Sequence, residues 1–154
     1  MATFIRYGAP SALDTTIAGA TLNNLASGSA VSGSDEDNTP ATGNGDLEAD
    51  FVLTVSYATG PPTAGTRVAD LYILYAVDGT NFPGTSNNPE EEFVGSFVSR
   101  NGSTSAVEYI PLKAVPMRPL KWKARLKNVS GVNFKADNNS TLQVQLSQLQ
   151  VVSS

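Results

Sequence analysis

Hydrophobic and polar residues alternate in a series of short runs along the chain. Successive side chains of a β-strand point to opposite faces of a sheet, so each run predicts a strand with one buried face. The clearest runs are residues 50–57, 67–75, 93–98, 107–112, 121–128 and 141–152, with shorter ones at 4–7, 15–19 and 27–33. Residues 67–75 are apolar on both faces, which predicts a central strand.

The run KWKARLKN at residues 121–128 has the most regular pattern. As a strand it points Trp122, Ala124 and Leu126 toward the core. Its four cations then share the outer face, whereas a helix would spread them around its whole circumference. We refer to this row as the cationic strip, which consists of Lys121, Lys123, Arg125 and Lys127.

The last run changes phase near its middle. Apolar residues between 142 and 146 share one parity, whereas Leu149 and Val151 have the opposite one. A β-bulge adds one residue to a strand and restores the alternation beyond it. The sequence therefore predicts a bulge near Ser147–Gln148.

Turn residues separate the runs, and no segment has the pattern of a normal amphipathic helix. Asp78-Gly79 is a hairpin signal, and the best helical candidate, residues 11–26, is rich in Thr, Asn and Gly, which form helices poorly. Seven to nine short strands joined by turns predict an all-β fold, an antiparallel β-sandwich that is jelly-roll-like. The length predicts one domain over residues 1–154, in which residues 1–45 are either part of the sandwich or an extended N-terminal arm with an acidic loop.

The residue types that the chain lacks exclude several kinds of catalytic and metal site. The chain has no histidine and no cysteine, which excludes Ser-His-Asp and Cys-His catalysis, disulfides and the usual zinc ligands. Its start has no apolar run of signal-peptide length, and no segment is apolar enough to span a membrane. We expect a protein made in a cytoplasm, with no cofactor and no membrane partner.

Charge is distributed unevenly along the sequence. The net charge of −4 divides into −10 for residues 1–112 and +6 for residues 113–154. The cationic strip has three interpretations: a solvated face or lysine-protected edge, a contact with an acidic protein surface, or a nucleic-acid site. The inward parity of Trp122, which removes it as a base-stacking group, disfavours nucleic acid. The candidate protein-contact residues are Lys121, Lys123, Arg125, Lys127, Glu90, Glu91, Glu92, Asp35, Glu36 and Asp37.

Other residue groups suggest ligands less strongly. The loop at residues 77–84 offers Asp78, Asn81 and Phe82 as candidate glycan contacts, with Phe82 either free to stack on a sugar or folded over the hairpin. Tyr72 and Tyr109 are further candidate aromatic groups. The acid-rich stretches do not follow EF-hand spacing, and a contiguous run of three glutamates is typical of a solvated turn or a protein contact, not of a catalytic pair.

Several segments together carry a resemblance. They are ATFIRYGAP, DLEADFVLTVSY, GPPTAGTRVADLYILYAVDGTNF, FVGSF, IPLKAVPMRPLKWKARLKNVSG and NNSTLQVQLSQLQ. In this order, over roughly residues 2–150, the chain resembles small virion proteins of tailed bacteriophages that decorate or cement the capsid. The resemblance implies a jelly-roll-like sandwich that forms a homotrimer on the capsid exterior and binds the major capsid protein at capsomer junctions. It implies no catalytic residues.

Two functions follow as hypotheses. The first is a non-enzymatic capsid decoration protein, assembled in the host cytoplasm, that stabilises the head. The alternative is a tail or baseplate attachment module that binds host-surface glycan through loops such as 77–84 and 85–92. An enzyme is disfavoured by the residue inventory.

Overall fold

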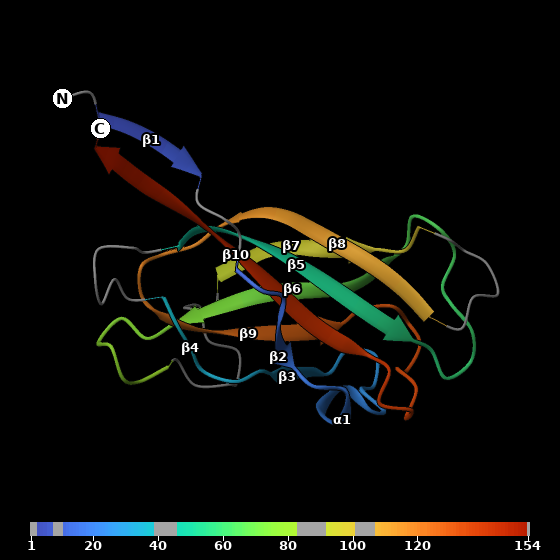
Figure 1. The fold of residues 1–154 in the computed structure, drawn as a ribbon. Helices are drawn as coiled ribbons and strands as arrows, with labels where there is room; N and C mark the ends of the chain where they lie inside the picture. Colours follow the sequence, from blue (N-terminus) through green and yellow to red (C-terminus); the bar gives the residue numbers. More distant parts are fainter. Residues whose placement is uncertain (1–2, 8–10, 39–45, 83–91, 101–106, 154) are drawn as a thin grey trace.

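The computed structural model describes residues 3–7, 11–38, 46–82, 92–100 and 107–153 (Figure 1). In this part of the chain ten strands and one short helix form two antiparallel sheets. The strands are β1 (Thr3–Tyr7), β2 (Asp14–Ile17), β3 (Ala30–Ser32), β4 (Glu36–Asp37), β5 (Asp46–Ser56), β6 (Arg67–Tyr75), β7 (Glu92–Val98), β8 (Val107–Pro116), β9 (Lys121–Asn128) and β10 (Thr141–Ser153), and the helix is α1 (Gly19–Leu22). No described helix is long and apolar enough to cross a membrane.

The strand order is that of a jelly roll. One sheet has the order β1-β10-β5-β8, with β2 also on β10, and the other has the order β3-β9-β6-β7, with β4 also on β9. β1 and β2 pair with successive parts of β10, just as β4 and β3 pair with successive parts of β9. Each pair therefore occupies one strand position, which leaves the four positions per sheet of a jelly roll. The predicted antiparallel sandwich is confirmed.

The core lies between the two sheets and follows the predicted parity. Along β9 burial alternates residue by residue, and Trp122, Ala124 and Leu126 are fully buried. The Trp122 ring meets Phe51 of β5 edge to face, with ring centroids 5.9 Å apart. Such aromatic pairs add to the free energy gained from burial.

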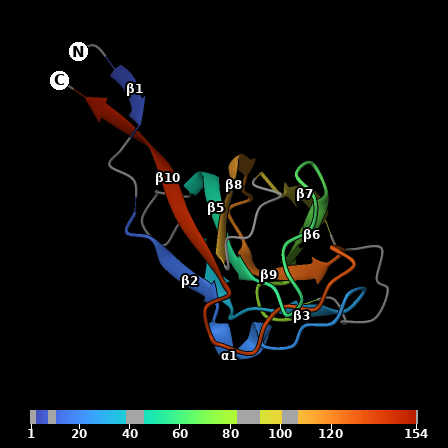
Figure 2. The ribbon, with the colours of Figure 1, turned by 90° about the vertical axis from the view of Figure 1, so that its right-hand side faces the viewer.

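The N-terminal part contributes to this core. Ile17 on β2, Leu22 on α1 and Leu25 are buried in the same cluster as Trp122. Figure 2 shows α1 at one end of the sandwich, beyond β2. The described residues from Asp14 to Leu25 are thus part of the sandwich, not an arm apart from it.

Three finer features of the sheets bear on the predictions. β6 lies between β9 and β7, so it is a central strand as predicted. The register of β10 against β5 shifts between Ser147 and Gln148, which confirms the predicted bulge. β6 and β7 are consecutive and pair antiparallel, which confirms a hairpin around Asp78-Gly79, but β6 ends at Tyr75 and β7 begins at Glu92, so the connection is long.

Candidate functional site

The cationic strip lies on the outer face of the sheet that contains β9. Its four side chains are half-buried, and β9 has β6 on one side and β3 and β4 on the other. β9 is therefore not an edge strand, and protection of a free edge is excluded as the role of these cations.

Acidic residues of β4 and of the segment before it lie against this strip within the same chain. The Nζ atom of Lys123 is 2.6 Å from a carboxylate oxygen of Asp35. In the next strand, Asp37 is directly opposite Lys121. On the other side of β9, the buried Asp70 is opposite Lys127. Opposite charges that are far apart in the sequence are thus brought together inside one molecule.

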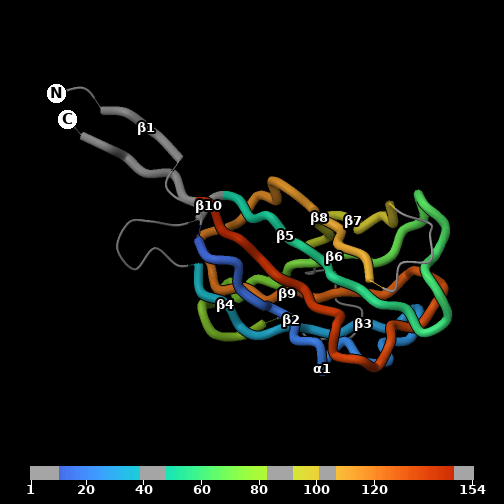
Figure 3. The backbone as a smooth tube through the Cα atoms, turned by 45° about the vertical axis from the view of Figure 1, so that its right-hand side comes forward, coloured from blue at the N-terminus to red at the C-terminus, as the bar shows by residue number. Residues whose placement is uncertain are grey.

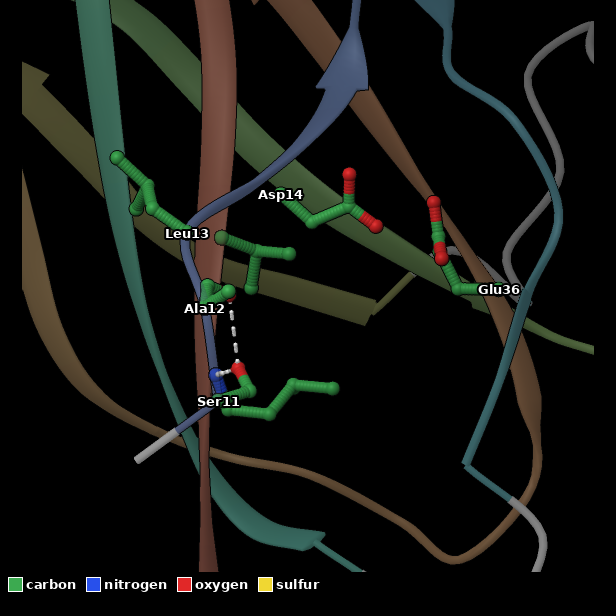
Figure 4. Close-up of a pocket in the computed structure, with 7 residues that line it drawn as sticks. Ser11, Ala12, Leu13, Asp14 and Glu36 are labelled. Atoms are coloured by element: carbon green, nitrogen blue, oxygen red, sulfur yellow. Dashed lines mark hydrogen bonds between the residues drawn. The ribbon is translucent and has the colours of Figure 1, made fainter. Parts of the chain in front are cut away.

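Glu36 lies at a pocket on the other side of β4. The pocket has a volume of about 320 Å³ and is lined by Ser11, Ala12, Leu13, Asp14, Glu36, Val144 and Leu146. Figure 4 shows the carboxylates of Asp14 and Glu36 close to each other at this pocket. Burial raises the pKa of Glu36, and the nearby charges of Asp14 and Asp35 raise it further, against a hydrogen bond from Ser34 that lowers it.

The candidate glycan contacts in the loop after β6 interact with other residues of the same chain. Asp78 accepts hydrogen bonds from the backbone N–H groups of Asn81 and Thr80, at 2.7 and 2.9 Å, and from the Asn81 side chain at 2.7 Å. These bonds lower the pKa of Asp78 to about 2. The ring of Phe82 lies 4.1 Å from the Lys123 ammonium, a cation–π contact that holds it against the sheet. Asp78 and Asn81 thus fold the turn, and Phe82 is not a freely projecting ring.

The glutamate run is only partly described. Glu90 and Glu91 lie outside the described residues. Glu92 begins β7, and its carboxylate is 3.0 Å from the guanidinium of Arg118. Both side chains are about half exposed, so this ion pair adds little to stability.

Exposed apolar side chains mark a surface that the sequence patterns indicated only in part. In the described part of the chain β7 pairs with β6 alone and β8 with β5 alone, so each is the edge strand of its sheet. The two strands lie side by side across the sandwich (Figures 1 and 3). We call this pair of edge strands the rim. It holds Phe93, Val98 and Tyr109, which are 54, 38 and 70 % exposed.

Phe93 and Val98 were not identified from the sequence. The run FVGSFV has apolar residues at both parities, which was the available signal. Tyr109 was noted as an aromatic candidate, and the structure places it on the outer face of β8, opposite Thr54 of β5. Phe93 and Val98 are on the outer face of the sheet that contains β7, and Tyr109 is on the outer face of the other sheet. Large exposed apolar groups on edge strands are candidates for binding surfaces.

A buried carboxylate was also missed. Glu108 on β8 is 2 % exposed and accepts hydrogen bonds from the Tyr57 hydroxyl at 2.7 Å and from Ser99 Oγ at 2.9 Å. It shares the parity of the inward Ile110, and that parity was the signal for its burial. These bonds tie β8 to the ends of β5 and β7. Glu108 is therefore enclosed by protein donors.

Tyr57 gives a prediction for alkaline pH. Burial raises its pKa, and the hydrogen bond to Glu108 raises it further. An unfolded tyrosine ionises near pH 10, so the folded state holds this proton more tightly, and its contribution to stability is present below that pH and lost above it. We expect the free energy of unfolding to fall above about pH 10, and urea titrations will measure it. Tyr57→Phe should show a shallower fall. An equal slope in both proteins would contradict this assignment.

The described residues form no metal or catalytic constellation of a familiar kind. No group of three or more His, Cys, Asp or Glu side chains among them is arranged to hold a metal ion. The surfaces left to consider are the cationic strip, the pocket at Asp14 and Glu36, and the rim.

Comparison with known proteins finds remote structural likenesses. The sequence matches no family model and no curated protein. A β-porphyranase of glycoside hydrolase family 86 from Bacteroides plebeius is 11 % identical, with a TM-score of 0.44 over 92 % of this chain. This chain spans about a fifth, 21 %, of that enzyme.

Two smaller solved structures are also similar over almost their whole length. CsCBM6-3 from Clostridium stercorarium, solved with cellobiose, is 8 % identical, with a TM-score of 0.35 over 99 % of this chain and 94 % of its own. CBM35 from Paenibacillus barcinonensis is 15 % identical, with a TM-score of 0.33 over the whole of both chains. At these identities and TM-scores, no role passes from these proteins to this chain.

Proposed function

We propose that this chain is a non-enzymatic structural protein of a virus particle, which binds neighbouring proteins through the rim and decorates the capsid exterior. The observation that carries the proposal is the placement of Phe93, Val98 and Tyr109 on two adjacent edge strands. Exposed apolar groups lose contact with water when a partner covers them, which favours association. The bacteriophage setting comes from the sequence resemblance, as do the major capsid protein as partner and the homotrimer.

The charge arrangement supports a restricted role for the cationic strip. Lys123 is held by Asp35 and by the Phe82 ring, so it is less available to a partner than its sequence suggested. Lys121 and Lys127 are half-buried on the same outer face. We assign these cations to positioning a partner, because peripheral charges set orientation more than affinity.

Occupancy on particles tests this function. Purified full-length chain is added to heads assembled without it, and bound copies are counted by gel densitometry. We expect many copies per head and a higher temperature of genome release. Tyr109→Glu should reduce occupancy about tenfold or more, because it places a charge where an apolar group is covered. Val77→Glu is the matched control, since Val77 is 78 % exposed and lies outside the rim. Absence of binding to heads would refute the decoration role.

Glycan binding is the second candidate, and Tyr109 favours it. A tyrosine ring that is 70 % exposed on a sheet face is suited to stack on a sugar ring. This role predicts retention of the chain on host-surface polysaccharide or on cellobiose-bearing resin, lost in Tyr109→Ala. Retention on sugar without occupancy on heads would select attachment over decoration.

A further inference from the structure

The two strands of the rim differ in how their free edges are protected. A free edge offers unpaired N–H and C=O groups, and proteins block it with proline, lysine or bulges. β8 contains Pro111, Lys113 and Pro116. β7, with the sequence EFVGSFV, contains neither proline nor lysine. Short, weakly charged strands of this composition readily accept another strand.

The register of β7 shows which side chains such a strand would meet. Gly95 is opposite Leu71 and Phe97 is opposite Ala69, so both face the core. The register shifts at Leu71 and Tyr72, which leaves Val94 as the extra residue of a bulge.

On the outer face of β7, Phe93 lies opposite Tyr72 and Ser96 lies opposite Asp70. The Phe93 and Tyr72 ring centroids are 5.6 Å apart. Val98 has the same outward parity as Ser96. The two exposed apolar residues of β7 therefore point to one side of the sheet, near the two ends of the strand.

We propose that two copies of this chain pair β7 with β7 in antiparallel register about a two-fold axis at Ser96. A two-fold contact uses the same patch on both copies. In this register Phe93 of one copy lies opposite Val98 of the other, because Val94 is bulged, and Gly95 lies opposite Phe97. Both exposed apolar residues are then covered, twice, and the two sheets become one continuous sheet.

The charges at the two ends of β7 fit this arrangement. Glu92 begins the strand, pairs with Arg118 of its own chain and is about half exposed. At the other end, Arg67 lies opposite Val98 with its side chain 59 % exposed and paired with Asp70 of its own chain, and Arg100 follows as an exposed residue. Antiparallel pairing brings the acidic end of each copy to the basic end of the other. Complementary charge of this kind fixes register and orientation.

The stoichiometry distinguishes this contact from the homotrimer that the sequence resemblance implies. An isologous contact joins two copies and does not close a ring of three. The inference does not depend on the capsid role, because it concerns the isolated chain and is measured without particles.

Sedimentation equilibrium of the purified full-length chain over a concentration series tests the pairing. We expect a reversible equilibrium between one and two chain masses. Phe93→Glu and Val98→Lys should each weaken the dimer about tenfold or more, since each change acts at two symmetric positions. The double variant F93E/V98K places the introduced carboxylate of each copy opposite the introduced ammonium of the other and should recover most of the affinity. Val77→Lys should leave the dissociation constant unchanged.

Circular dichroism of each variant shows whether the fold is retained, and both changes are made at exposed positions to favour this. Val98 is the cleaner site, because Phe93 also contacts Tyr72 within the chain. A chain that stays monomeric throughout the series, or a mass of three chains, would overturn the proposal. So would a double variant that is no tighter than the two single ones. Loss of the dimer in Tyr109→Glu with no loss in Val98→Lys would place the contact on β8 and would equally refute it.

Discussion

Replacing Trp122 with alanine lowers the free energy of unfolding by about 3–5 kcal/mol, the largest effect we expect from a single change. Trp122 is fully buried and meets Phe51 edge to face at the centre of the sandwich. Truncation removes this contact and leaves a cavity between two sheets that cannot close it fully. Urea titration followed by far-ultraviolet circular dichroism measures the change.

Trp122→Phe separates two contributions at the same position. The Nε1–H of Trp122 is buried and has no hydrogen-bond acceptor among the described atoms, so part of the benefit of the ring is offset by an unpaired donor. Phenylalanine removes that donor and keeps most of the aromatic volume. We expect a cost of about 1–2 kcal/mol, well below that of alanine.

A residue on the outer face of the same strand gives the matched control. Lys127 is on the same strand with opposite parity, and its side chain is on the outer face. Lys127→Ala should change the free energy of unfolding by about 0.5 kcal/mol or less. Equal losses at Trp122 and Lys127 would contradict the assignment of the two faces of β9.

Removal of the Glu108 carboxylate is expected to cost about 3 kcal/mol. Glu108→Ala leaves the Tyr57 hydroxyl without its acceptor, and leaves Ser99 Oγ only the longer contact, 3.4 Å, to the Pro62 carbonyl. An unsatisfied buried donor loses its hydrogen bond to water and gains nothing in exchange. Glu108→Gln keeps the shape and one acceptor oxygen, so its cost should be about half as large. Thermal and urea unfolding measure both variants.

Glu92 provides the control for a carboxylate that is exposed. It pairs with Arg118 on the surface, and Glu92→Gln should cost about 0–1 kcal/mol. If Glu108→Ala were as mild as Glu92→Gln, Glu108 would not be the link between β8 and the ends of β5 and β7.

The local pattern of the sequence predicted the parts of the fold that depend on parity. The alternation in KWKARLKN placed Trp122 and Leu126 in the core, and the change of phase near Ser147 located a bulge in β10. Both follow from the two-residue period of a strand. β4 was not predicted, because a strand of two residues has no period to detect.

The contacts within the candidate site join segments that are far apart in the sequence. The alternation along one strand does not predict which strand lies beside it. The opposite charges of the two parts of the chain are evident in the sequence, but the contact of Lys123 with Asp35 depends on β4 lying beside β9. The same holds for Phe82, which reaches Lys123 only because the connection after β6 returns over the outer face. Lys123, Asp35 and Phe82 are therefore engaged with one another within the molecule.

The rim was missed for a related reason. Which strand ends a sheet is set by topology, and the jelly-roll order makes β7 and β8 the edge strands. In the sequence, FVGSFV is simply another apolar run. Its exposed residues can be recognised as part of a surface only when the structure shows that β7, in the part of the chain that it describes, has a neighbouring strand on one side alone.

Hydrogen exchange of the chain bound to capsids, compared with the free chain diluted until it is monomeric, tests the central claim that the rim binds the partner. Amides of β8 around Tyr109 and of β7 between Phe93 and Val98 should exchange at least about tenfold more slowly in the bound state, whereas those of α1 and of residues 77–82 should be unchanged. Protection confined to residues 77–82 or to the strands around the cationic strip, with the rim unaffected, would contradict the account.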